Sequence, residues 1–155
     1  MNYNEVLQQM DPRYALFGLF FAFSNTLQAA GDSFYEEITC KQFFLLACMS
    51  LFPEEAPTAN ELAKVMGCTR QNVKEILNSL EKKGYVRLEA DPTDKRKKRV
   101  YETDAIRMVA EKYREKEEQF MAALYHDVSE EDIHKVFAVI NHMTGNLVHM
   151  GDKKN

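Results

Sequence analysis

The order of hydrophobic and polar positions in residues 58–103 predicts two short helices followed by two strands. Apolar side chains recur at helical spacing in residues 58–67 and again in residues 69–84. Residues 85–90 and 99–103 alternate between apolar and polar side chains, as strands do. The apolar side of the first helix consists of Leu62, Ala63, Val65 and Met66. The second helix has an apolar stripe at i, i+3, i+4 and i+7, formed by Val73, Ile76, Leu77 and Leu80.

Two capping-box sequences predict where helices begin. Thr58 is followed three residues later by Glu61, and Thr39 is followed in the same way by Gln42. In such a pair, each side chain satisfies a backbone amide that has no partner at the start of a helix. We therefore expect one helix to begin after Thr58, and an earlier one to run from Thr39 to about Leu51.

Glycine and threonine residues predict a tight turn between the two helices of residues 58–84. Gly67 suits the left-handed position that closes a helix, and Thr69 suits the N-cap of the next one. Gly84 follows the last apolar position of the second helix. The loop between the strands begins with turn-forming residues and ends with four cations, Lys95, Arg96, Lys97 and Lys98. Helix, turn, helix and basic hairpin together predict a winged helix-turn-helix.

A further helix is expected near the N-terminus, and it is apolar on most of its sides. Pro12 suits its first turn, and the helix should run to about Ala30 and end at Gly31. A helix of this kind must be buried on most sides. It is either a central core helix or a helix that contacts both its own core and a second subunit. Its apolar residues are Leu16, Phe17, Leu19, Phe20, Phe21, Phe23 and Leu27.

Two amphipathic helices are expected after the hairpin. Asp104 can cap the first, which should reach Tyr125, and Ser129 with Asp132 begins the second. The apolar side of the first consists of Met108, Val109, Tyr113, Phe120 and Leu124. The apolar side of the second consists of Ile133, Val136, Phe137, Ile140, Met143, Leu147 and Met150. These helices and the N-terminal one carry more apolar surface than the small motif can cover, so we predict that they pack across a two-fold axis as a homodimer.

These expectations define a mainly α (α+β) fold, a winged helix-turn-helix whose N- and C-terminal helices form a dimerisation arm. Residues 1–37 and 104–155 are assigned to this arm, and residues 38–103 to the winged helix-turn-helix domain. The dimer contacts are expected to include Phe17, Phe20, Ile133, Phe137, Ile140 and Leu147.

Charge is distributed unevenly along the 155 residues. The whole chain carries −4 at pH 7, which by itself argues against DNA binding, and its hydrophobic content of 45% is enough for a sizeable core. Residues 58–103 hold eleven Lys and Arg against seven Asp and Glu, a net charge of +4, and the rest of the chain carries −8. Positive charge is therefore concentrated in the motif, where phosphate contact requires it.

Cysteine content and hydropathy predict a soluble cytoplasmic protein. Three cysteines without metal-type spacing fit a reducing compartment better than a disulfide framework. The longest apolar run, residues 14–23, has ten residues, whereas crossing a bilayer takes roughly 20. Asp11 and Arg13 directly precede this run, unlike the start of a secretion signal.

Several motifs point to a known family. Residues 80–86 read Leu-Glu-Lys-Lys-Gly-Tyr-Val, residues 91–96 read Asp-Pro-Thr-Asp-Lys-Arg, and residues 38–43 read Ile-Thr-Cys-Lys-Gln-Phe. With this order of helices, the chain resembles the MarR family of bacterial transcription regulators over nearly its whole length. One departure follows the wing. The family usually continues Leu-Thr-x-x-Gly, whereas residues 102–106 read Glu-Thr-Asp-Ala-Ile.

The resemblance implies a homodimer with one recognition helix per subunit in the DNA major groove and the wing in the adjacent minor groove. In this family, small anionic or aromatic ligands or cysteine oxidation commonly relieve DNA binding, which implies a repressor controlled in this way. Phe17, Phe20 and Phe44 can line a ligand cavity, but ordinary core packing explains these three residues equally well.

The polar face of the predicted recognition helix supplies candidate DNA contacts. Arg and Lys side chains suit guanine, and Gln and Asn side chains suit adenine. A solvated helix face is the alternative, but a helix that begins directly after a tight turn favours DNA contact. The candidates are Thr69, Arg70, Gln71, Asn72, Lys74 and Asn78.

The wing supplies a second group of candidates, Asp94, Lys95, Arg96, Lys97 and Lys98. By resemblance, Arg96 enters the minor groove, where narrow A·T-rich DNA attracts a guanidinium. Asp94, two residues earlier, would hold the Arg96 side chain by a charge-assisted hydrogen bond. A merely soluble hairpin tip is the alternative.

Cysteines and histidines are weaker candidates for a functional site. Cys68 lies at the positive end of the recognition helix, which lowers a thiol pKa, but a small turn residue is the simpler interpretation. Cys40 and Cys48 are interpreted as structural. No metal site is predicted, because a zinc site needs closer ligands than the three histidines of the last helix, His134, His142 and His149.

The motifs of common enzymes are missing from the sequence. It has no Gly-rich phosphate loop after a strand, no nucleophile elbow and no metal-binding helix pair. We therefore predict a non-enzymatic protein without cofactors. Its expected partners are double-stranded DNA with a pseudo-palindromic operator, a second copy of the chain, and a small aromatic or anionic effector. A winged-helix module for protein interaction is the alternative, but such a module does not need four adjacent cations at its tip.

Overall fold

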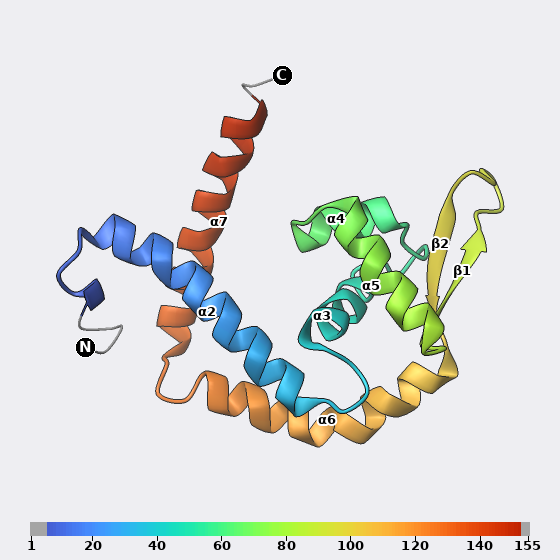
Figure 1. Ribbon diagram of the computed structural model, residues 1–155, viewed down its shortest axis with the longest axis horizontal. Coiled ribbons are helices and arrows are strands. Elements are labelled where there is room, and N and C mark those ends of the chain that lie inside the picture. Colours follow the sequence, from blue (N-terminus) through green and yellow to red (C-terminus); the bar gives the residue numbers. More distant parts are fainter. Residues whose placement is uncertain (1–5, 153–155) are drawn as a thin grey trace. The chain divides into compact units, whose positions relative to one another are not determined.

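The computed structural model describes residues 6–152 and is mainly helical, with one two-stranded sheet (Figure 1). The outermost residues of both predicted arm segments lie outside this range. Two compact units form, one through Lys112 and one from Tyr113. The elements are α2 (Pro12–Phe34), α3 (Cys40–Met49), α4 (Ala59–Met66), α5 (Arg70–Lys82), β1 (Val86–Ala90), β2 (Lys98–Glu102), α6 (Asp104–Leu124) and α7 (Glu130–Asp152). The predicted fold, a winged helix-turn-helix with terminal helices, is confirmed.

Both predicted capping boxes are present. At the start of α3, Thr39 Oγ1 accepts a hydrogen bond from Gln42 N, and Gln42 Oε1 accepts one from Thr39 N. Thr58 and Glu61 bond in the same way at the start of α4. Gly67 closes α4 with a φ of 65°, a left-handed conformation that glycine adopts without strain. These local signals therefore place the turn between α4 and α5 where the sequence predicts it.

We call residues 38–103 the winged unit. Its core combines one face of each of its helices, α3, α4 and α5, with the buried side of the hairpin. The apolar stripe of α5 is confirmed, although Ile76 is only half-buried. Burying one large aliphatic side chain contributes about 1.5–3 kcal/mol, so the unit holds a core of its own. Its most deeply buried aliphatic residues are Leu45, Leu62, Val73, Leu77, Leu80 and Val100.

The two strands of the wing pair in antiparallel fashion, with Ala90 opposite Lys98 at the far end. Each strand agrees with its prediction to within one residue at either end. Thr103, predicted as a strand residue, follows β2, and its Oγ1 donates a hydrogen bond to the Gly84 carbonyl at 2.6 Å. This bond closes the base of the hairpin against the end of α5.

The prediction that α2 ends at Gly31 is wrong. α2 continues to Phe34, and Gly31 is the one buried residue of this helix, all of which lies in the described part of the chain. A Cβ atom at Gly31 would lie 2.7 Å from the Cβ of Cys40, at the start of α3. Glycine is therefore required here by the close approach of two helices, and not by a helix end.

Two other predicted helix ends also differ. α3 ends at Met49, two residues before Leu51. Asp104 is the first residue of α6, and its carboxylate pairs with Arg107 at 2.9 Å instead of capping the helix from outside. The acidic residue still lies in the first turn, where the helix dipole favours negative charge.

In α4 and α6, two positions that were predicted to be on the apolar side are exposed. Val65 of α4 faces solvent, and so does Met108 of α6. In α6 the buried residues are Ile106 and Tyr113, seven positions apart on one face. Met108 follows Ile106 by two residues, about 200° around a helix, which explains its exposure.

The terminal helices expose much of their apolar surface. A central core position for α2 is wrong for this chain, because Gly31 alone is buried among its residues, all of them described. None of the helices within residues 6–152 has both the length and the apolar character needed to span a membrane. In α2 the large exposed apolar residues are Tyr14, Leu16, Phe17, Leu19, Phe21 and Phe23. In α7 they are Val136, Phe137, Val139, Ile140, Leu147, Val148 and Met150.

Candidate nucleic-acid interface

α5 presents polar side chains on its exposed face and packs its apolar stripe on the core. The helix begins at Arg70, directly after the turn, and Thr69 Oγ1 accepts a hydrogen bond from Asn72 N at 3.2 Å. All the predicted contacts of this helix are exposed, namely Thr69, Arg70, Gln71, Asn72, Lys74 and Asn78. The helix therefore offers cations and amides on one surface, the chemistry that reads base edges.

Glu75 also belongs to this exposed face, although it was not among the predicted residues. Gln71 Nε2 donates a hydrogen bond to Glu75 Oε1 at 3.2 Å. Residues four apart are neighbours on a helix surface, so their spacing was the signal that could have revealed the pair. The face thus combines donors, acceptors and a carboxylate, a mixture suited to base edges rather than to phosphates alone.

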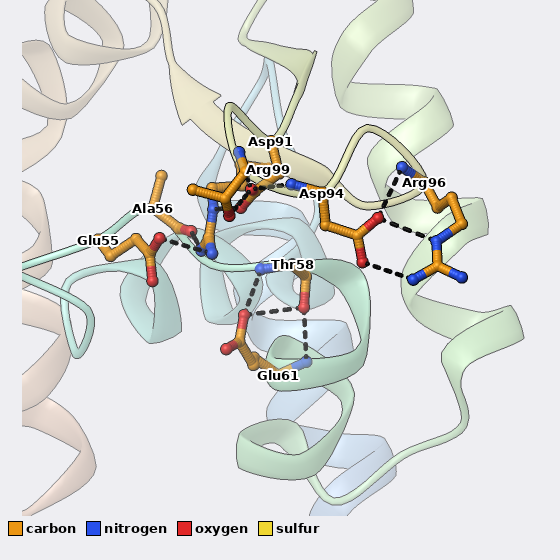
Figure 2. Close-up of polar contacts among 9 residues, drawn as sticks. Glu55, Ala56, Thr58, Glu61, Asp91, Asp94, Arg96 and Arg99 are labelled. Atoms are coloured by element: carbon orange, nitrogen blue, oxygen red, sulfur yellow. Dashed lines mark hydrogen bonds and ion pairs between the residues drawn. The ribbon is translucent and has the colours of Figure 1, made fainter.

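At the tip of the wing, Asp94 holds the side chain of Arg96 (Figure 2). Arg96 Nε donates to Asp94 Oδ1 at 3.0 Å and Arg96 Nη2 donates to Asp94 Oδ2 at 3.2 Å. The bonds from Arg96 hold the pKa of Asp94 below its usual value. The Arg96 side chain is 92% exposed. The contact predicted between these two residues is present, and it orients a guanidinium that faces solvent.

The lysines of the wing tip stand on a turn that its own backbone closes. Lys97 N donates to the Asp94 carbonyl at 2.8 Å, and Asp91 N donates to the Lys97 carbonyl at 3.0 Å. Lys95, Lys97 and Lys98 are exposed. Their charges are therefore accessible to an anionic partner such as a phosphate backbone.

Asp91 is buried at the start of the wing loop, directly after β1, and accepts four hydrogen bonds. Its Oδ1 accepts from Thr93 Oγ1 at 2.6 Å and from the amides of Thr93 and Asp94 at 2.8 Å. Its Oδ2 accepts from Arg99 Nε at 2.5 Å. These donors, with the Thr93 hydroxyl first, hold the pKa of Asp91 well below its ordinary range. A carboxylate only 2% exposed is thus satisfied by the turn and by Arg99.

Arg99 connects the wing to the linker that precedes α4 (Figure 2). Its Nη1 donates to the Ala56 carbonyl at 2.6 Å, and its Nη2 lies 2.6 Å from Glu55 Oε1. The amide of Val100 donates to the Pro57 carbonyl at 2.8 Å. The sequence pattern did not predict these contacts, because Arg99 and Ala56 are 43 residues apart.

The cysteines differ in their surroundings. Cys48 is buried and Cys40 is partly buried, and burial is the main cause that raises the pKa of both thiols. A raised pKa keeps a thiol protonated and less reactive, which agrees with a structural role. Cys68 is partly buried, and its sensing role stays a prediction. Across residues 6–152, no three His, Cys, Asp or Glu side chains gather as metal ligands.

The residues predicted to form dimer contacts lie on α2 and α7. Two of them, Phe20 and Ile133, are half-buried. The other four are exposed in the single chain, Phe17, Phe137, Ile140 and Leu147. Their role in dimerisation stays a prediction.

Comparison with known proteins finds similar sequences and folds. A sequence model of the MarR family matches residues 38–97. The fold is similar to the Staphylococcus aureus MepR–DNA complex, with 24% identity and a TM-score of 0.72 over 83% of this chain and 94% of that one. It is also similar to a MarR protein from Peptoclostridium difficile, with 21% identity and a TM-score of 0.76 over 90% and 92% of the two chains.

A third solved structure has the same fold at lower sequence identity. It is a MarR/EmrR family regulator from Acinetobacter sp. ADP1, with 13% identity and a TM-score of 0.77 over 90% of this chain and 99% of that one. No curated protein sequence gives a significant match. Residues 38–97 contain the helix-turn-helix and the tip of the wing described above. Residues 38–97 therefore match the MarR family, and the chain has the fold of the solved MarR-family structures to which it is similar.

Proposed function

We propose that this protein binds a specific DNA operator as a homodimer and represses transcription. One observation carries the proposal: the exposed polar face of α5 lies in the same compact unit as a basic wing whose Arg96 is already oriented by Asp94. MepR, which has a similar fold, was crystallised in complex with DNA, and this supports DNA as the partner.

In the proposed complex, α5 enters the major groove and Arg96 enters the adjacent minor groove. Arg70 and Lys74 suit guanine or phosphate, and Gln71 and Asn72 suit adenine. The lysines of the wing contact phosphates. The net charge of +4 in residues 58–103 attracts DNA although the whole chain is acidic, because short-range contacts depend on the local charge.

The homodimer is proposed from the exposed apolar faces of α2 and α7. Monomeric soluble proteins rarely expose apolar patches larger than a few hundred Å², and a second copy of the chain is a partner that is always present. In this proposal, residues 1–37 and 104–155 form the dimerisation arm and residues 38–103 form the DNA-binding domain. A two-fold axis then requires a pseudo-palindromic operator with half-site centres about 10 to 10.5 base pairs apart.

The proposed repression is relieved by one of two signals. A small aromatic or anionic ligand bound next to the winged domain, or oxidation of a cysteine, would lower operator affinity. Cys68 is the cysteine proposed for the second route, since it lies in the turn directly before α5. The two routes separate experimentally: a Cys68→Ser variant loses the response to peroxide and keeps the response to a ligand.

The decisive experiment is binding of the purified full-length protein to the DNA upstream of its own gene. We expect a discrete complex whose affinity falls steeply with salt, because each neutralised phosphate releases counterions. The absence of a complex, or an affinity that is independent of salt, would show that the winged helix serves another kind of partner, such as a protein.

A further inference from the structure

A continuous chain of polar contacts runs from the linker before α4 to the tip of the wing (Figure 2). Arg99 joins the linker carbonyl of Ala56 to the carboxylate of Asp91. The other oxygen of Asp91 accepts the amide of Asp94, and the carboxylate of Asp94 binds Arg96. The exposed guanidinium at the tip is thereby connected to the start of the helix-turn-helix.

The linker itself is a fixed point. Thr58, two residues after Ala56, is the N-cap of α4 and is held by Glu61. Thr58 and Arg99 also form an antiparallel bridge between the linker and β2. The linker is therefore bonded to the start of α4, and Arg99 is bonded to the linker.

A two-stranded hairpin is marginally stable on its own and needs outside support to keep one orientation. Its own contacts, such as the ion pair of Arg87 with Glu89 and the stacking of Arg87 on Tyr101, stay within the wing. Arg99 instead reaches out of the wing. Arg99 is only 8% exposed, and its guanidinium binds Asp91 and the linker. This guanidinium is therefore not accessible to DNA.

We propose that Asp91 and Arg99 are positioning residues, which lock the wing to the helix-turn-helix so that Arg96 and α5 meet DNA in one fixed register. We call Glu55, Ala56, Asp91 and Arg99 the wing anchor. The inference rests on the proposed function, since it assigns the wing anchor a role in DNA recognition by that same surface. Loosening the wing anchor leaves Arg96 in place but removes its fixed orientation, and this weakens the readout of the minor groove.

The chemistry of Asp91 offers a substitution that breaks one link only. In Asp91→Asn, the amide oxygen can still accept the three bonds of the turn from Thr93 and Asp94, whereas the amide nitrogen replaces the acceptor of Arg99 Nε. Arg99→Met breaks the same link from the other side with an apolar chain of similar length. The two variants change the net charge by +1 and −1, so simple electrostatics predicts opposite effects on DNA affinity. Positioning predicts the same effect for both.

The experiment uses the full-length protein and duplexes that carry a sequence selected from random DNA with the wild-type protein. Each duplex has either A·T-rich or G·C-rich flanks beside the contacts of the wing. We expect Asp91→Asn and Arg99→Met each to bind the A·T-flanked duplex about tenfold more weakly than the wild type, and the G·C-flanked duplex with little change. Adding Arg96→Ala to either variant should cause little further loss, because both changes act through one contact.

Arg87→Met is the matched control, because it removes an arginine from the same hairpin outside the wing anchor. It should lower affinity for both duplexes equally and keep the preference for A·T flanks. Circular dichroism and thermal unfolding report whether each variant is folded. If Arg99→Met does not fold, Asp91→Asn alone is sufficient for the test. In this variant the amide oxygen can still accept the hydrogen bonds of the turn from Thr93 and Asp94.

The possible outcomes distinguish failure of the proposed function from failure of the positioning role. If the wild type selects no sequence, the proposed function fails, and the wing anchor loses its role with it. If the wild type selects a sequence but Asp91→Asn keeps the flank preference or binds more tightly, the positioning role is overturned and the proposed function stands. A full second loss on adding Arg96→Ala overturns the positioning role as well.

Discussion

Large apolar side chains are buried in the winged unit, whereas on the terminal helices many of them are exposed. In the winged unit, Leu62 and Leu77 are 0% and 1% exposed, whereas Phe137 and Leu147 of α7 are 69% and 67% exposed. A buried side chain already stabilises the single chain, but an exposed one contributes only when something covers it. The winged unit thus has a core of its own. The terminal helices are expected to gain theirs from a second copy of the chain.

The largest effect is expected from placing charged residues on the exposed apolar face of α7. Replacing both Phe137 and Ile140 by Asp should give a monomer and abolish operator binding, because unpaired carboxylates are costly to bury. Sedimentation measures the mass, and titration of the operator measures affinity. The matched control, Phe137→Leu with Ile140→Val, should stay dimeric. A folded monomer of the charged variant that binds the operator with wild-type affinity would contradict the proposed dimer.

A matched pair of truncations sharpens the contrast. Leu77→Ala should destabilise the protein by about 2–5 kcal/mol at every protein concentration, because it opens a cavity in a core within one chain. Leu147→Ala should destabilise it by an amount that depends on concentration, since its contact belongs to an association equilibrium. Denaturant unfolding at several concentrations distinguishes the two. An effect of Leu147→Ala that is independent of concentration would argue against a dimer contact there.

Within the winged unit, substitutions at the tip of the wing should have smaller effects than substitutions in the core, and these effects should depend on the DNA sequence. Arg96→Ala should cost roughly 1 to 3 kcal/mol of operator binding, mainly where the flanks are A·T-rich. Asp94→Asn should give a milder version of the same loss and leave the fold intact, since an exposed pair contributes little to stability. Quantitative binding to A·T- and G·C-flanked operators tests both variants. Equal weakening on both would reduce Arg96 to a phosphate contact.

The smallest expected effects belong to the wing lysines. Lys97→Ala and Lys98→Ala should each weaken all DNA sequences about equally and lower the salt slope by about one contact. Affinity measured over a series of salt concentrations gives that slope directly. An unchanged slope would mean that the lysine in question does not touch the phosphate backbone.

The parts of the fold that the sequence predicts well depend on neighbouring residues. Thr58 and Glu61 cap a helix because they stand three positions apart, and the stripe of α5 is set by the helical repeat. The pair Asp94 and Arg96 is equally local. The polar face of α5 and the tip of the wing were predictable for this reason.

The errors come from contacts between distant segments. A glycine is typical of a helix end, so Gly31 was predicted to end α2. Only the close approach of α3 shows why glycine is required at this position. In α6, the choice of buried face depends on what packs against it, so Met108 was assigned in place of Ile106. Arg99 looked like an ordinary strand residue, because its partners lie in a linker that carries no motif. The wing anchor was therefore out of reach of pattern analysis.

The contact between Val100 and Pro57 also bears on self-association. A two-stranded sheet has two outer edges, and an open edge can pair with a strand of another molecule. On β2, the linker occupies part of that edge through the Val100 amide and the bridge of Thr58. On β1, the exposed Arg87 and Glu89 place charges that hinder pairing. We therefore expect both edges of the hairpin to resist pairing with a strand of another molecule at high protein concentration.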